Sequence, residues 1–163
     1  MTRDAGFTLL EILVSLVIIG IIVSLAVLAI GDRGQAKLET EARRLTALMR
    51  AAQEEAILNA TQFGLAFGQR GYLFFRLGSE GWNRIEDDNV FRPRSLEEPL
   101  DLALRLEGLP VVLAAEPGDK PQIFVLSSGE TSPFELELSL DERRSLKIAV
   151  DNLGQSLITS EDR

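Results

Sequence analysis

The sequence predicts an α+β protein: a long N-terminal α-helix, membrane-spanning in its first half, followed by an antiparallel β-sandwich of two sheets. Three observations support this prediction. Residues 12–30 are uncharged and mostly Ile, Leu and Val, residues 38–56 repeat apolar side chains at a helical period, and short alternating apolar runs follow residue 60. A chain of 163 residues is long enough for one folded domain behind the helix.

Composition excludes several kinds of chemistry. The chain has 25 Asp and Glu against 17 Lys and Arg, a net charge of −8, so general binding to nucleic acid is disfavoured. It has no Cys and no His, which removes disulfides, thiol nucleophiles, imidazole bases and the usual zinc ligands. We therefore expect neither a cofactor nor a metal.

The apolar run from Ile12 to Ile30 has 19 residues. As a helix it spans roughly 28 Å, close to the hydrocarbon thickness of a bilayer. A plain signal anchor, or a signal peptide cleaved near residues 27–29, would also contain such a run. Cleavage there is disfavoured because the run exceeds the usual apolar stretch of about 7–15 residues and Glu11 interrupts its start. We assign residues 7–31 to a transmembrane helix.

Glu11 stands at the start of this run, where an ionised side chain in lipid is costly and marks a functional site. The helix dipole favours negative charge near a helix start, and Phe7 lies one turn before Glu11. A cut after Gly6 would free an amine on Phe7 within reach of this carboxylate. The alternative is that Glu11 only extends its carboxylate to the water interface.

The stretch GFTLLE, residues 6–11, followed by the apolar run resembles the class III leader of type IV pilins and pseudopilins. The resemblance implies that residues 1–6 are a leader, which a prepilin peptidase removes between Gly6 and Phe7 on the cytoplasmic side. It also implies that the new amine of Phe7 is methylated. Glu11 would then pair with the N-terminus of a neighbouring subunit as the helices pack into a filament core.

Residues 32–59 are predicted to form the amphipathic second half of the helix. One stripe, with spacings of three and four residues, comprises Leu38, Ala42, Leu45, Met49, Ala52 and Ala56. Two heptads are too few for a coiled coil, so we expect the stripe to dock on the chain's own domain. Gly31 and Gly34 each weaken a helix by up to about 1 kcal/mol relative to Ala, which permits a bend or break there.

Residues 60–163 are predicted to form the β domain. Its clearest hairpin has Phe134, Leu136, Leu138 and Leu140 on one face of the first strand and Leu146, Ile148 and Val150 on the second. Further strands are predicted at residues 63–67, 72–77, 100–106, 110–115 and 122–126, and residues 87–99 are predicted to be irregular. Short strands at this spacing favour an antiparallel sandwich.

No catalytic residue is predicted. Glu135 and Glu137 share a strand face, as paired glycosidase carboxylates can, but the alternation favours a solvated outer face. Residues 127–130 lack serine-hydrolase spacing, and a chain without His has no conventional triad. Residues 86–89, EDDN, carry oxygen ligands suited to Ca²⁺ but lack EF-hand spacing, so we expect a solvated loop.

Two C-terminal stretches are similar to the closing region of the H-type minor pseudopilins of type II secretion: IFVLSSGETSPFELEL, residues 123–138, and IAVDNLGQS, residues 148–156. This resemblance implies a structural subunit at or near the tip of a pseudopilus that helps to export folded proteins across the outer membrane. Its partners would be other minor and major pseudopilins, the prepilin peptidase and the inner-membrane assembly platform. It would be a single-pass inner-membrane protein with a cytoplasmic leader and a periplasmic C-terminal domain.

Two further functions are compatible with the same sequence. A minor pilin of a type IV pilus concerned with DNA uptake would need a basic stripe, for which the candidates are Arg70, Arg76, Arg84, Arg92 and Arg94. A membrane-anchored periplasmic binding domain would not enter a filament, so Glu11→Leu would leave it unaffected. Ordinary hairpin turns account for residues 128–130 and 152–154 equally well.

Overall fold

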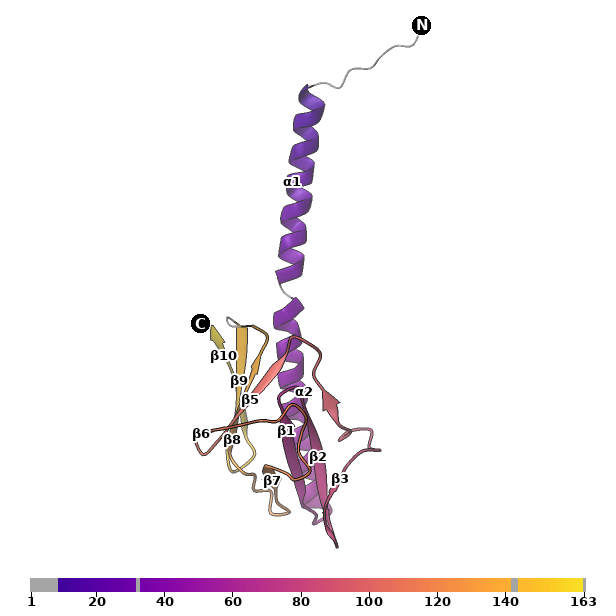
Figure 1. Ribbon diagram of the computed structural model, residues 1–163, viewed down its shortest axis with the longest axis vertical. Coiled ribbons are helices and arrows are strands. Elements are labelled where there is room, and N and C mark those ends of the chain that lie inside the picture. Colours follow the sequence, from indigo (N-terminus) through magenta and orange to yellow (C-terminus); the bar gives the residue numbers. More distant parts are fainter. Residues whose placement is uncertain (1–8, 32, 142–143, 163) are drawn as a thin grey trace. The chain divides into compact units, whose positions relative to one another are not determined.

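A computed structural model describes residues 9–31, 33–141 and 144–162. The chain divides into two compact units, Met1–Ala36 and Lys37–Arg163. Figure 1 shows one helix in the first unit and, in the second, strands beside the helix that follows. The assignment of residues 1–6, 7–31, 32–59 and 60–163 to separate segments stays a prediction.

The first unit contains helix α1, Leu9–Gly31, and the start of helix α2, Arg33–Leu58. Gly31 ends α1 and Gly34 lies in the first turn of α2, so the predicted weak point coincides with the boundary between two helices. The linking residue, 32, lies outside the described residues.

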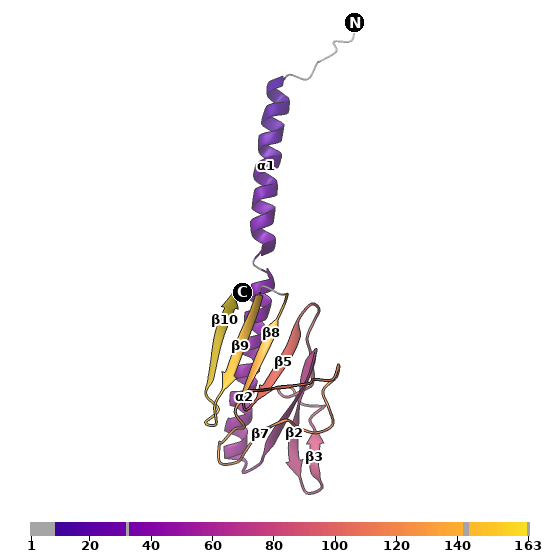
Figure 2. The ribbon, with the colours of Figure 1, turned by 60° about the vertical axis from the view of Figure 1, so that its left-hand side comes forward.

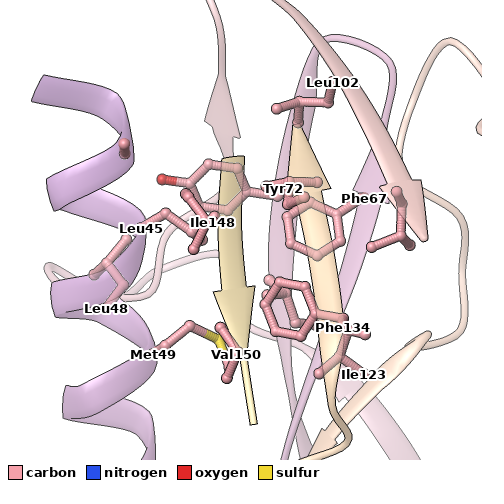
Figure 3. Close-up of a cluster of buried hydrophobic side chains, with 14 of the residues drawn as sticks. Leu45, Leu48, Met49, Phe67, Tyr72, Leu102, Ile123, Phe134, Ile148 and Val150 are labelled. Atoms are coloured by element: carbon pink, nitrogen blue, oxygen red, sulfur yellow. The ribbon is translucent and has the colours of Figure 1, made fainter. Parts of the chain in front are cut away.

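The second unit begins with most of α2, whose apolar stripe is buried as the sequence predicts. Its members are Leu38, Ala42, Leu45, Met49, Ala52 and Ala56, and Leu48 joins them at the flank. Figure 3 shows Leu45, Leu48 and Met49 directed from α2 toward Ile148 and Val150. The stripe therefore packs on the chain's own domain.

Ten strands form two antiparallel sheets of five strands each. Sheet A contains β1 (Phe63–Gly68), β2 (Gly71–Gly78), β3 (Gly81–Arg84), β4 (Arg94–Ser95) and β7 (Ile123–Val125), in the order β3-β2-β1-β7 with β4 also paired to β2. Sheet B has the order β10-β9-β8-β5-β6, with β5 (Asp101–Leu106), β6 (Leu109–Val111), β8 (Phe134–Ser139), β9 (Arg144–Val150) and β10 (Ser156–Asp162). The predicted helix followed by two antiparallel sheets is confirmed.

One apolar core joins α2 to both sheets. The aromatic rings of Phe67 and Phe134 bring the two sheets together, with centroids 5.8 Å apart. Tyr72 lies in the same core and is 2% exposed. Burial, with a smaller contribution from Glu41, raises the pKa of its phenol to about 12.

Sheet A is buried on its second face as well. A Cβ at Gly64 would lie 2.5 Å from Pro121, and one at Gly68 would lie 2.6 Å from the backbone of Pro117. The absence of a side chain at these glycines allows the segment before β7 to cross the sheet closely.

The alternation in the C-terminal hairpin predicts its structure correctly. Phe134, Leu136 and Leu138 are buried on β8, and Leu146, Ile148 and Val150 on β9. Leu140 follows the end of β8 and is half-buried against the core. The strands predicted at 63–67, 72–77, 100–106 and 122–126 are also confirmed with small changes in their ends.

Three features differ from the predictions. The strand predicted at 110–115 ends at Val111, because the carbonyls of Leu113 and Ala114 accept hydrogen bonds from Gln69 instead of continuing a ladder. The segment 87–99 is mostly irregular but contains β4. The sequence pattern does not predict β3 or β10, since β3 has only four residues and the side chains described on β10, at residues 156–160, are all exposed.

Candidate functional site

The residues predicted for processing lie at the N-terminus. Gly6 and Phe7 are outside the described residues, so the structure neither supports nor contradicts their roles. Glu11 is in the first turn of α1, where the helix dipole favours a negative side chain. It is exposed, and its backbone carbonyl accepts a hydrogen bond from the Ser15 hydroxyl at 2.7 Å.

α1 carries apolar side chains around its whole circumference. All its described side chains, at residues 9–25, are exposed, and most of them are Leu, Ile or Val. Ser15 and Ser24 satisfy their hydroxyls within the helix, since the Ser24 hydroxyl donates to the Gly20 carbonyl at 2.9 Å. A helix that is apolar all round requires apolar surroundings on every side.

A search limited to the residues that the structure describes finds no helix with the length and apolar character needed to cross a membrane.

The two glutamates on β8 do not form a catalytic pair. Glu135 and Glu137 are half-buried on the outer face of sheet B, as the alternation predicts. The Glu135 carboxylate lies 2.8 Å from the Lys147 ammonium and 3.9 Å from the Arg105 guanidinium. The negative charge of Glu135 is therefore balanced by basic side chains of the neighbouring strands β5 and β9.

The acidic loop at residues 86–89 has a structural use for one of its carboxylates. Asp88 accepts hydrogen bonds from the backbone N–H groups of Val90 at 2.7 Å and Phe91 at 3.0 Å. These bonds hold the pKa of Asp88 below its usual value. Among the described residues, no group of three or more acidic side chains is arranged to hold a metal ion.

Three of the five arginines considered for DNA binding are engaged with acidic residues. Arg70 pairs with Glu98, Arg84 pairs with Asp119, and the Arg76 guanidinium lies 2.7 Å from the Glu55 carboxylate. Arg94 donates to the Val90 carbonyl at 3.3 Å, and Arg92 is exposed. Positive charge balanced in this way does not form the basic stripe that a phosphate backbone requires.

The two C-terminal stretches that carry the resemblance meet on α2. Their turns contain Gly129 (φ 90°) and Gly154 (φ 73°). Gln53 of α2 binds one backbone carbonyl in each turn. The Gln53 side-chain amide donates to the Gly129 carbonyl at 2.5 Å and to the Leu153 carbonyl at 2.8 Å. Nothing in the sequence marks Gln53, because its partners are 76 and 100 residues away.

Sequence comparisons identify relatives along nearly the whole chain. A family model described as type II transport protein GspH matches residues 41–154, and one described as a prokaryotic N-terminal methylation motif matches residues 1–27. The chain is 35% identical to the type II secretion system protein H of Pseudomonas aeruginosa, over 93% of each chain. It is 27% identical to the protein of the same name from Aeromonas hydrophila, over 94% of this chain and 92% of that one.

Solved structures agree with this relationship. The minor pseudopilin EpsH from the type 2 secretion system of Vibrio cholerae is 25% identical, with a TM-score of 0.64 over 76% of this chain and 97% of that one. The fold is also that of Escherichia coli GspH in solution, with a TM-score of 0.63 over 79% of this chain and 92% of that one, at 18% identity. The chain therefore belongs to the GspH family, the structural, non-enzymatic minor pseudopilins of the type II secretion system.

Proposed function

We propose that this minor pseudopilin is a structural subunit of the type II secretion pseudopilus, at or near its tip, and that it helps to export folded proteins across the outer membrane. The observation that carries the proposal is that one chain joins a methylation motif at residues 1–27 to a GspH domain at residues 41–154. Such a chain can enter a filament through its N-terminus and present its β domain to other proteins.

Processing of the N-terminus is the first step of this proposal. A prepilin peptidase would remove residues 1–6 by cutting between Gly6 and Phe7, and the Phe7 amine would be methylated. The methylation-motif match covers both residues and supports this assignment. The mature chain would then begin four residues before Glu11.

The apolar run in the sequence supports a membrane position of the helix. Residues 12–30 are uncharged and would cross roughly 28 Å as a helix. The leader would lie in the cytoplasm and the β domain in the periplasm, with the helix in the bacterial inner membrane. Helix packing would then draw the subunit into the periplasmic pseudopilus.

Glu11 is proposed to align this packing. A carboxylate near the membrane surface carries a cost that pairing with a neighbour's N-terminal amine would offset. As a pseudopilin, the chain interacts with components of the secretion system. Among these we propose other minor and major pseudopilins, the prepilin peptidase and the inner-membrane assembly platform as partners.

The processing step is tested by the intact mass and N-terminal sequence of the full chain, expressed with and without a prepilin peptidase. We expect a chain that begins at Phe7 with one added methyl group only when the peptidase is present. A chain that begins at Met1 in both cases would contradict the proposal. A chain that begins after Ala29 would instead identify an ordinary secretory signal peptide.

The role of Glu11 is tested by replacing it in cells that contain the complete secretion system. We expect Glu11→Leu to insert into the membrane and be processed normally, but not to co-purify with other pseudopilins. Ser15→Ala, one turn along the same helix, removes only a hydroxyl bonded within the helix and serves as the control. Normal co-purification of Glu11→Leu would favour an inert anchor.

A further inference from the structure

Among the described residues, β10 is the longest edge strand and the one least protected against pairing with another chain. The other outer strands are short: β3 has four residues, β4 has two, β7 has three, and β6 has three and includes Pro110. Short strands and prolines are common protections of sheet edges. β10 has seven residues, no Pro or Gly, and an unbroken register with β9 from Ser156↔Val150 to Asp162↔Arg144.

The backbone of β10 presents unused hydrogen-bonding groups. In an antiparallel pair, residues that exchange backbone hydrogen bonds alternate with residues that do not. The Asp151 N–H donates to the Gln155 carbonyl at 3.1 Å, so Asp151 and Gln155 are a hydrogen-bonded pair at the turn between β9 and β10. By the register, Leu157 and Thr159 bond to β9, so Ser156, Ile158 and Ser160 direct their N–H and C=O groups outward. Within the described part of the chain, no strand pairs with this side of β10.

The side chains of β10 leave room on both faces of the sheet. Leu157 lies opposite Ala149 on the outer face and is 66% exposed, whereas Ile158 lies opposite the buried Ile148 and is 37% exposed. A hollow of about 510 Å³ adjoins Leu157 on the outer face. Figure 2 shows β10 as the outermost strand of its sheet.

A second hollow lies on the inner side, between α2 and the start of β10. Its volume is about 760 Å³, and it is lined by Arg50 and Glu54 of α2 and by Gln155 and Ser156. The outer hollow extends from Leu157 across β9 and β8 to Arg105 of β5, and the inner hollow adjoins only the first residue of β10, Ser156. Charged residues line both hollows, among them Arg105 and Glu135 in the outer one and Arg50 and Glu54 in the inner one.

We propose that β10 is a docking edge, at which an extended segment of another secretion-system component adds to sheet B as a further strand. Backbone hydrogen bonds to Ser156, Ile158 and Ser160 would supply affinity, and the exposed side chains of Leu157 and Ile158 would contact side chains of the added strand. The occupant is a different and less acidic protein, because two copies of this chain, each with an overall net charge of −8, would repel one another. This inference rests on the proposed role as a pseudopilus subunit.

Hydrogen–deuterium exchange of single amides tests the docking edge directly. The full chain is measured alone in detergent and after co-purification with the pseudopilins of its own secretion system. We expect the amides of Ile158 and Ser160 to exchange about tenfold or more slowly in the complex. Those of Leu157 and Thr159, which bond to β9, should be protected in both samples. Equal exchange of Ile158 and Ser160 in both samples would overturn the proposal.

A matched pair of variants tests the same edge by a second route. Ser160→Pro removes an outward N–H and leaves the β9 ladder intact, whereas Ser160→Ala keeps the N–H. We expect the Pro variant to recover roughly fivefold less pseudopilin than the Ala variant, with the same unfolding temperature. Equal recovery would contradict strand addition, and unfolding of the Pro variant alone would show that the Ser160 N–H serves the β9 ladder.

The outcomes separate this inference from the proposed function. A chain that starts at Phe7 and co-purifies in a Glu11-dependent way, but shows no change at β10, would refute strand addition and leave the filament role intact. Protection at β10 that rises with the concentration of the isolated chain would identify a second copy as the occupant and overturn the hetero-partner proposal. Failure of the wild-type chain to co-purify with any pseudopilin would refute both.

Discussion

Replacing Gly154 by Ala should destabilise the β domain through a specific contact with α2. Gly154 has φ 73°, and a Cβ built there would lie 2.7–2.8 Å from all three heavy atoms of the Gln53 side-chain amide. The new methyl group would therefore displace the amide that holds the turns at Gly129 and Leu153. The substitution combines backbone strain with the loss of two hydrogen bonds.

The expected loss of unfolding free energy is the sum of the backbone strain and the lost hydrogen bonds. A non-glycine residue in the left-handed region costs about 1–2 kcal/mol, and each lost hydrogen bond costs about 0.5–1.5 kcal/mol. Gly154→Ala should thus lower the free energy of unfolding by about 2–5 kcal/mol. Gly108→Ala is the matched control, because Gly108 has φ 78° and its Cβ would meet nothing within 4 Å. The control Gly108→Ala should lower the free energy of unfolding by only about 1–2 kcal/mol.

The assay is urea unfolding of the full chain in detergent, followed by the fluorescence of Trp82, the only tryptophan. The four proteins of a double-mutant cycle, wild type, Gly154→Ala, Gln53→Ala and the double variant, are compared. We expect a coupling energy of roughly 1–2 kcal/mol, because Ala at 53 leaves no amide to displace. Equal losses in Gly154→Ala and Gly108→Ala, with coupling below about 0.4 kcal/mol, would refute the reasoning.

Three further results are expected from the same structure. Leu136→Ala should cost about 2–5 kcal/mol of unfolding free energy, since Leu136 is fully buried, whereas Leu109→Ala, at a side chain 70% exposed, should change it by less than about 0.5 kcal/mol. The ultraviolet absorbance of Tyr72, the only tyrosine, should titrate near pH 12 in the folded chain and near about 10 in urea. Because the folded pKa is the higher one, stability should fall as pH rises above about 10, and Tyr72→Phe should remove that part of the fall. Asp88→Ala should lower the free energy of unfolding at neutral pH. Because folding lowers the pKa of Asp88, the difference in unfolding free energy between this variant and the wild type, measured by chemical unfolding, should shrink as pH falls below about 4.

Periodicity predicted the helical stripe and the C-terminal hairpin because each depends on neighbours in the chain. Leu38, Ala42 and Leu45 recur at the helical period, and this alone places them on one buried face. On β8, the alternation of Phe134 and Leu136 with glutamates determines which face is inward. Residues 110–115 look equally strand-like, but the bonds of Gln69 to Leu113 and Ala114 stop the ladder at Val111.

The class of the protein could be recognised from the sequence, because the leader motif, the apolar run and the period changes are local patterns. Which distant groups meet depends on tertiary packing. Gln53 contacts two turns 76 and 100 residues away, and β10 lies at an outer edge whose exposed Leu157 and Ile158 give no strand pattern. Such contacts depend on how α2 and the two sheets pack, and packing brings together residues that no spacing in the chain relates.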